Sequence, residues 1–299
     1  MSKVDMYFIL IFTFLCTCIP SYTKIYDCFI FFNELELLKM RLEELNDHVD
    51  YFVLVESVET QRGDPKPLYF QENQHLFEKY LPKIKHIIVN EYLDSNTIDP
   101  VTGLCWDREH FQRKCIMRGL KQCDDLDIIM ISDLDEIPRK QVLETLRLLL
   151  YREKRKPNKL VIKNPPDAIA LEMPLFMYQL NRKSEMHGGR WIGTVATLYD
   201  QVKRKGVQFF RDNRGSFFQI MDGGWHFTWM GGKDRIRQKL LNVVEGRDKE
   251  SVDSISDEEM ETWIQAQEII PVDSSYPNDF PKYMEKHIDY FRSIGYIAE

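Results

Sequence analysis

Short apolar runs and amphipathic segments alternate along the first half of the chain. The apolar runs have the length of buried strands and are bounded by polar residues. They predict strands at Ile25–Phe32, Asp50–Val58, Ile84–Val89 and Asp127–Ser132. The segments between and after them place apolar residues every three or four positions, as helices with one buried face do. They predict helices at Glu34–Asn46, Gln71–Tyr80, Trp106–Gln122 and Pro138–Tyr151.

Strands that alternate with helices in this order predict an α/β fold. The expected architecture is a mostly parallel, Rossmann-like sheet with right-handed crossovers and helices on its faces. After Lys159 the pattern changes to short strand-like runs between aromatic and glycine-rich loops, followed by charged helices. The predicted strands are Leu160–Lys163, Ala168–Met173 and Thr194–Tyr199, and the predicted helices are Lys233–Glu245 and Ser256–Glu268. We expect residues 24–299 to form one domain, with a second half (152–299) that adds antiparallel strands to the first (24–151).

The first residues of the chain differ from the rest. Met6–Ile19 is continuously apolar and follows a basic residue, Lys3. The run is short for a bilayer span, and it fits a secretory signal peptide or a short signal anchor better than a buried first element. Residues 1–23 are therefore expected to direct the chain into the secretory pathway, to the lumen or membrane of the ER or Golgi. Cys18-Ile19-Pro20 is not an ideal small-x-small cleavage site, so cleavage or retention stays open.

Polar side chains gather where the predicted strands end. These are Asn33 and Glu34, then Glu56 and Thr60, then Asn90 and Glu91, and last Asp133, Asp135 and Glu136. In open α/β sheets, ligands bind in the crevice beyond the carboxyl ends of the strands. A single polar strand end carries little information, because every strand must end in a polar loop. Four in succession predict a nucleotide-binding crevice.

The polar residues after the last of these strands are the most informative. Ile128–Ser132 is an apolar run that ends in Asp133-Leu134-Asp135-Glu136. If the chain bends there, Asp133 and Asp135 can converge on one hard cation, and oxygen ligands suit Mg²⁺ or Mn²⁺, which substrate phosphates and water usually complete. The alternative is a solvated acidic turn, since Asp135, Glu136 and Pro138 would also suit a helix start. Its position after a buried strand favours a metal–diphosphate site.

A second unusual segment is Gly223-Gly224-Trp225-His226-Phe227-Thr228-Trp229. The glycines permit close backbone approach, and Trp225 and Trp229 could stack on a sugar or a base. His226 is either a metal ligand through a neutral imidazole or a buried structural histidine.

The predicted helix before the acidic strand begins with Trp106-Asp107-Arg108-Glu109-His110-Phe111-Gln112-Arg113. Arg108 and Arg113 could bind a diphosphate, because a guanidinium matches phosphate geometry, and Glu109 could act as a base. Glu109 and Arg113 could equally be an i,i+4 ion pair on an exposed helix face.

Composition narrows the class further. The net charge of −7 argues against nucleic acid as a partner. Neither a P-loop nor a dinucleotide glycine motif is present. Two of the six cysteines lie in the leader, and the remaining four (Cys28, Cys105, Cys115 and Cys123) allow three full disulfide pairings or none. Cys28, in an apolar strand, could simply be a buried thiol.

Four segments together resemble glycosyltransferase family 17. In chain order they are Ile25–Leu35, Asp50–Ser57, Ile131–Arg139 and Gly223–Phe227, and the resemblance spans about Lys24 to Leu241. Each segment is weak alone, and the four in family order are quite specific. The chain departs from the expected pattern at Glu59–Gly63, where a Thr-Phe-x-Gly-like loop would stand.

The resemblance implies an A-type glycosyltransferase fold, with a nucleotide-sugar half and an acceptor half. It implies a UDP-GlcNAc donor, Mn²⁺ or Mg²⁺, inversion at the anomeric carbon, and a glycan or glycoprotein acceptor whose mannose receives a β-1,4-linked bisecting GlcNAc. The Asp-x-Asp carboxylates of such enzymes hold the metal and the sugar nucleotide. That role falls here on Asp133 and Asp135, with His226 as a third metal ligand.

Further residues are predicted to serve the donor and the reaction. Residues expected to contact the donor are Asn33, Glu34, Glu56, Arg108, Arg113 and Asp133. Transfer with inversion needs a base that takes the proton of the acceptor hydroxyl. The candidates are Glu109, Glu136, Glu185 and Asp222.

Two other functions compete with this one. The chain could be another metal-dependent sugar-nucleotide enzyme, such as a hydrolase. It could also be a silent glycan-binding protein that stacks sugars on Trp191, Trp225 and Trp229, although such a protein has no need for a diphosphate metal site. Membrane association through the N-terminal segment is a further possibility under every one of these functions.

Overall fold

The computed structural model describes residues 23–91, 97–98, 105–150, 166–270, 272 and 280–298. The predicted leader, up to residue 22, and the predicted strand Leu160–Lys163 lie outside the described residues.

Four parallel strands form the first part of the sheet, as the alternating pattern predicts. They are β1 (Ile25–Phe31), β2 (Tyr51–Ser57), β3 (Ile84–Val89) and β4 (Ile128–Asp133), in the spatial order β3-β2-β1-β4. β8 (Arg190–Leu198) then pairs antiparallel with β4, and β6 (Ala168–Met177) pairs antiparallel with β8. The α/β class and the mixed strands of the second half are thus confirmed.

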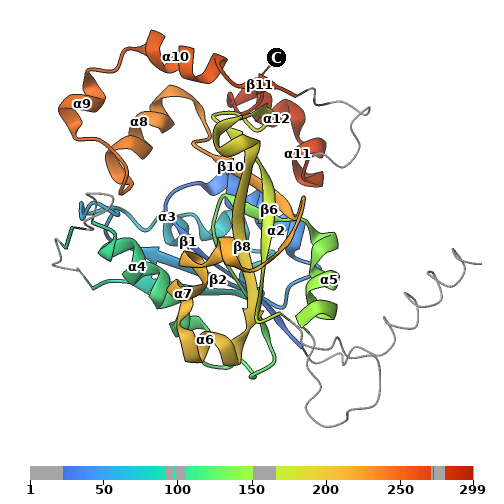
Figure 1. Cartoon of the computed structure of the whole chain (residues 1–299). Coiled ribbons are helices and arrows are strands. Elements are labelled where there is room, and N and C mark those ends of the chain that lie inside the picture. The colour runs from blue at the N-terminus through green and yellow to red at the C-terminus, as the bar shows by residue number, and fades with distance from the viewer. Residues whose placement is uncertain are drawn as a thin grey trace, which may run out of the picture.

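Helices cover both faces of this sheet (Figure 1). α2 (Leu35–Leu45) and α5 (Lys140–Leu150) pack on one face, while α6 (Tyr199–Lys205), α7 (Val207–Asp212) and the 3₁₀ turn Cys115–Gly119 pack on the other. Alternate residues of β1 point to opposite sides, so Phe29 joins the first core and Cys28 the second. Cys28 is therefore a buried thiol, and no disulfide is present in the part of the chain that the structure describes.

The remaining helices are short or lie away from the central sheet. α3 (Tyr69–Glu72) follows the loop after β2, and α4 (Asp107–Lys114) precedes the 3₁₀ turn at Cys115. α8 (Gly232–Asn242), α9 (Lys249–Asp253) and α10 (Asp257–Gln265) bury a small apolar cluster of their own. The chain ends with α11 (Lys282–Lys286) and α12 (Ile288–Ser293), which join the core beside α2.

A small group of strands lies beyond the end of β4. β5 (Glu136–Pro138) pairs antiparallel with β10 (Gly224–Thr228), and β10 also runs parallel to the end of β6. β9 (Phe218–Ile220) pairs with β6, and β7 (Arg182–Lys183) joins β6 to β11 (Glu268–Ile269). The register places His226 opposite Glu136, so β10 reaches the acidic loop from a distant part of the chain.

β5 corrects the expected start of the helix at Pro138. The helix begins at Lys140, and Glu136-Ile137-Pro138 is extended because Ile137 is fully buried and pairs with Trp225. Local helix-start chemistry is overridden here by a tertiary strand pairing.

Candidate active site

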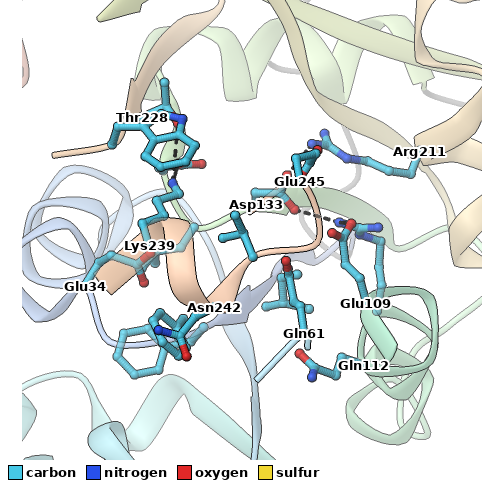
Figure 2. A pocket seen from close by; sticks show the side chains of 18 of the residues that line it. Glu34, Gln61, Glu109, Gln112, Asp133, Arg211, Thr228, Lys239, Asn242 and Glu245 are labelled. Atoms are coloured by element: carbon cyan, nitrogen blue, oxygen red, sulfur yellow. Dashed lines mark hydrogen bonds and ion pairs between the residues drawn. The ribbon is translucent and has the colours of Figure 1, made fainter. Parts of the chain in front are cut away.

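A pocket of about 630 Å³ lies beyond the carboxyl ends of β1, β2 and β4. The loops that follow these strands, the start of α4, the end of β10 and the end of α8 form its walls. Figure 2 shows Asp133 near its centre, with Glu109 on one side and Lys239 on the other. Of the polar residues predicted to gather at the strand ends, Glu34, Thr60, Asp133 and Asp135 line this pocket, and Asn90 and Glu91, after β3, do not.

The acidic loop at the centre of the pocket, Asp133–Glu136, is held in place by one buried arginine. Arg41 of α2 is fully buried and forms an ion pair with Asp27 of β1 at 2.6 Å. Its Nη1 donates to the backbone carbonyls of Asp133, Leu134 and Glu136 at 3.0, 3.0 and 2.8 Å. A guanidinium offers several donors in a fixed plane, so it fixes the bend that turns both aspartates toward the pocket.

Asp133 lies between two arginines. Arg113 Nη2 is 2.9 Å from its Oδ1, and Arg211 Nη2 is 2.5 Å from its Oδ2. Burial raises the pKa of the Asp133 carboxyl, but Arg211 and Arg113 outweigh burial and hold that pKa well below its usual range. The side chain is 32% exposed, so the ionised carboxylate still faces the cavity.

Glu136 lies behind this pair with no exposed surface. Its carboxylate accepts hydrogen bonds from both terminal nitrogens of Arg211, at 2.6 and 2.8 Å, and from the Trp191 indole at 2.7 Å. It also accepts from the backbone N–H of Asp133 at 3.1 Å. Glu136 is thus placed to orient Arg211 and Trp191 and does not line the pocket itself.

Asp135 points to the opposite side of the loop. Its Oδ1 is 3.5 Å from His226 Nε2, and its Oδ2 is 3.4 Å from Lys239 Nζ. Burial raises the pKa of this carboxyl, and Lys239 and His226 lower it further than burial raises it. Lys239 also donates to the Thr228 hydroxyl at 3.4 Å, a contact visible in Figure 2.

His226 lines the pocket and is nearly buried. Its ring lies 5.0 Å from the ring of Trp191, and its Nδ1 is buried without a hydrogen-bond partner in the described part of the chain. Gly224 allows β10 to approach β5 closely, because a Cβ there would lie 2.3 Å from the Ile137 carbonyl oxygen. The glycine therefore serves strand packing, and through it the placement of His226.

The other predicted residues fall into two groups. Glu34, Glu109 and Arg113 line the pocket, with Glu109 and Arg113 also in the expected i,i+4 ion pair at 2.6 Å. Asn33, Glu56, Arg108, Glu185 and Asp222 do not line it.

Each of the second group has another setting. Asn33 borders a smaller neighbouring cavity together with Glu34 and Asp135. Glu56 is fully buried at the end of β2, where its carboxylate accepts from the Phe70 N–H at 2.8 Å and lies 2.9 Å from His86 Nε2. Arg108 Nε is 3.7 Å from the Glu59 carboxylate, and Asp222 forms an exposed ion pair with Arg190. Glu185 is exposed, with Lys183 at 4.0 Å. Their predicted roles remain predictions.

Sequence patterns did not indicate several pocket residues. They are Gln61, Arg211, Arg214, Lys239 and Glu245. None belongs to a motif, and Arg211 meets Asp133 across 78 positions of sequence. A basic residue on an unremarkable helix carries no signal until the fold brings it to an acidic partner.

The donor set fits a divalent cation only in part. The described residues hold no group of three or more His, Cys, Asp or Glu side chains arranged to bind a metal. Asp135 and His226 do converge, and a buried imidazole nitrogen without a partner is what a ligand histidine offers. Mg²⁺ and Mn²⁺ commonly take one or two protein groups and complete their shell with phosphate oxygens and water. Two protein donors therefore suffice only when a phosphate ligand is bound.

Comparison with known proteins decides the family. The sequence pattern of glycosyltransferase family 17 matches residues 16–232. The chain belongs to glycosyltransferase family 17. The match contains the Asp-x-Asp loop and the glycine–histidine segment of β10, the two parts that meet at the pocket.

Relatives in mammals carry a more specific name. The chain is 26% identical to the β-1,4-mannosyl-glycoprotein 4-β-N-acetylglucosaminyltransferases of Rattus norvegicus and Mus musculus, over 88% of this chain and 52% of each relative. It is 25% identical to the Homo sapiens protein of that name, over 88% of this chain and 53% of the relative. The chain thus spans about half the length of the curated relatives it matches. Among the described residues, no helix is both long enough and apolar enough to cross a bilayer.

Proposed function

We propose that this chain transfers GlcNAc from UDP-GlcNAc to a mannose of an N-glycan, in a β-1,4 linkage of the bisecting type. The observation that carries the proposal is the pocket itself. Two acidic side chains at a parallel strand end are surrounded there by cationic side chains from three other segments (Arg113, Arg211 and Lys239). A pocket that concentrates cations around an Asp-x-Asp loop suits a nucleoside diphosphate. The names of the mammalian relatives support the sugar and the acceptor.

The diphosphate would lie against the cationic wall of the pocket. Four basic residues form this wall: Arg113, Arg211, Arg214 and Lys239. Arg214 lines the pocket and forms no ion pair among the described residues, and it donates to the carbonyls of Ile192 and Arg211 at 2.8 and 2.9 Å. Its remaining N–H groups are available to phosphate oxygens. Arg113 and Arg211, held by Asp133, would add charge that stabilises the leaving UDP.

A divalent cation, Mn²⁺ or Mg²⁺, is part of the proposal. Asp135 and His226 would hold it, with Asp133 as a further ligand if one of its oxygens leaves an arginine. The bound cation would offset the charge that builds on the leaving diphosphate. Lys239, which contacts the other carboxylate oxygen of Asp135, would also offset the negative charge of the leaving diphosphate.

A transfer assay tests this function. The purified protein is incubated with UDP-GlcNAc, Mn²⁺ and a biantennary N-glycan, and the glycan is weighed by mass spectrometry. A product heavier by one HexNAc supports the proposal. Release of UDP and free GlcNAc with an unchanged glycan would replace it with a hydrolase. Glycan binding without UDP release would replace it with a lectin.

The predicted leader suggests a compartment for this activity. We propose that residues 1–23 direct the chain into the secretory pathway, where glycoprotein acceptors are made, with retention as a membrane anchor still open. A reporter fused behind residues 1–30 should enter the endoplasmic reticulum and acquire glycans on its own acceptor sites. A reporter that stays in the cytosol would contradict this localisation.

A further inference from the structure

The loop that follows α8 brings another carboxylate to the pocket. Glu245 lines the cavity, and Figure 2 shows it beside Asp133, on the side of Arg211. No motif marks this residue in the sequence. It lies beyond the residues 16–232 that match the family pattern.

The backbone of this loop is tightly built. The Arg247 N–H donates to the Leu240 carbonyl at 2.8 Å, and the Gly246 N–H donates to the Val243 carbonyl at 3.0 Å. A Cβ on Gly246 would lie 2.0 Å from the Leu240 carbonyl oxygen, so the fold-back needs glycine. The Gln61 side chain, from the loop after β2, accepts from the Val244 N–H at 3.0 Å. The loop therefore spans from α8 to the opposite wall and holds Glu245 over the cavity.

Glu245 differs from the neighbouring carboxylates in what it contacts. Glu109 is paired with Arg113, Asp133 with two arginines, and Asp135 with Lys239. Glu245 has no ion pair and no hydrogen bond to another residue in the part of the chain that the structure describes. A carboxylate held by arginines is a poor base, because the cations stabilise its ionised form. In the described part of the chain, the Glu245 carboxylate forms no such ion pair.

The electrostatic surroundings of Glu245 raise the pKa of its carboxyl above the ordinary value. Glu245 is an exposed residue. The protein around its carboxyl still desolvates it in part and so raises its pKa, the negative charges of Glu109 and Asp133 raise the pKa further, and Lys239 lowers it. Carboxylates with raised pKa values are efficient proton acceptors because the catalytic optimum lies near the working pH.

We propose that Glu245 is the general base of the transfer. This assignment rests on the proposed function and names its proton acceptor. The acceptor hydroxyl oxygen forms a bond to the anomeric carbon of the donor sugar, and the bond from that carbon to the diphosphate oxygen breaks. The hydroxyl proton goes to the Glu245 carboxylate, and the bonding electron pair leaves with the nucleoside diphosphate. The cationic wall receives the leaving group, and Glu245 receives the proton.

Three variants test the assignment. Glu245→Gln keeps the shape and removes the proton acceptor, and Glu245→Asp keeps a carboxylate one methylene shorter. Glu250→Gln on α9 is the matched control, because it removes an exposed carboxylate close by in sequence. Each protein is assayed for HexNAc transfer and, separately, for UDP release from UDP-GlcNAc in water, and each is titrated with UDP for affinity.

The expected pattern is specific to a base. Glu245→Gln should lower kcat by about 100-fold or more, with UDP affinity and melting temperature within error of the parent. Glu245→Asp should recover part of the rate, and Glu250→Gln should equal the parent. If Glu245→Gln keeps more than half of the parent rate, or loses UDP affinity in place of kcat, the assignment is overturned. A parent protein that releases UDP without transferring HexNAc contradicts the proposed acceptor, and the base is then judged on UDP release alone.

Discussion

At the scale of single residues, the site is built from pairs of contacting side chains. For several of these pairs, the sequence patterns indicate only one of the two residues. Asp133, Asp135, His226, Glu109 and Arg113 were predictable, because each belongs to a segment with an unusual local pattern. Two of their partners, Lys239 and Arg211, were not. Lys239 lies on a charged helix and Arg211 on a short helix that was not predicted, and only the tertiary fold brings them within 3.4 Å and 2.5 Å of the aspartates.

The two aspartates carry the first prediction. Asp133→Ala and Asp135→Ala should each reduce transfer by about 100-fold or more, since each change removes a group that organises the cationic wall or a cation. Circular dichroism should show the parent fold in both, and Asp289→Ala, at a fully exposed position, should leave the rate unchanged. Full activity in either pocket variant would remove the Asp-x-Asp loop from the mechanism.

His226 carries the second prediction. A ligand role means that His226→Asn raises the Mn²⁺ concentration needed for half-maximal rate by at least about tenfold, with little change in melting temperature. The partner-free Nδ1 and the pocket position motivate this expectation. A variant that melts several degrees lower yet keeps the parent's metal dependence would make His226 a structural residue packed on Trp191.

At the scale of elements, periodicity predicted the parallel strands, α2 and α5 closely. The predicted helices Gln71–Tyr80 and Trp106–Gln122 are each a short α-helix followed by a 3₁₀ turn. Periodicity failed at Glu136-Ile137-Pro138, where proline after acidic residues suggested a helix start. The segment is instead a strand, because pairing with β10 buries Ile137. No local pattern in β5 refers to β10, which lies far away in sequence. The helices α6 and α7 were missed for a related reason, since each is short and is stabilised mainly by packing on the sheet.

The close approach of β5 and β10 gives the third prediction. Gly224→Ala places a Cβ within 2.3 Å of the Ile137 carbonyl oxygen and 2.9 Å of Pro138 Cα, so the strands must separate. We expect a loss of about 1–3 kcal/mol in the free energy of unfolding, together with lower transfer, because His226 lies two residues further along β10. Urea unfolding and the transfer assay measure both.

Gly215→Ala is the control for that change. The nearest atom to a Cβ at Gly215 is 4.0 Å away, so the substitution meets open space. Its stability and activity should match the parent. Equal behaviour of the Gly224 and Gly215 variants would show that strand spacing does not position the site.

At the scale of the whole molecule, the fold class and the family were both predictable from order and motif. Alternating strands and helices specify a parallel sheet, and the segments in family order specify glycosyltransferase family 17. What the order of elements does not specify is how the second half closes over the first. The contacts between α8, its following loop and Gln61 join residues 183 positions apart and complete the pocket.

The central proposal is that this pocket transfers GlcNAc to an N-glycan. The most direct test compares the parent with Asp135→Ala in one mass-spectrometric assay with UDP-GlcNAc, a biantennary N-glycan and Mn²⁺, with and without EDTA. We expect a product heavier by one HexNAc for the parent with Mn²⁺, and no product with EDTA or with the variant. An unchanged glycan with the parent, or equal product from the parent and the variant, would contradict the proposal.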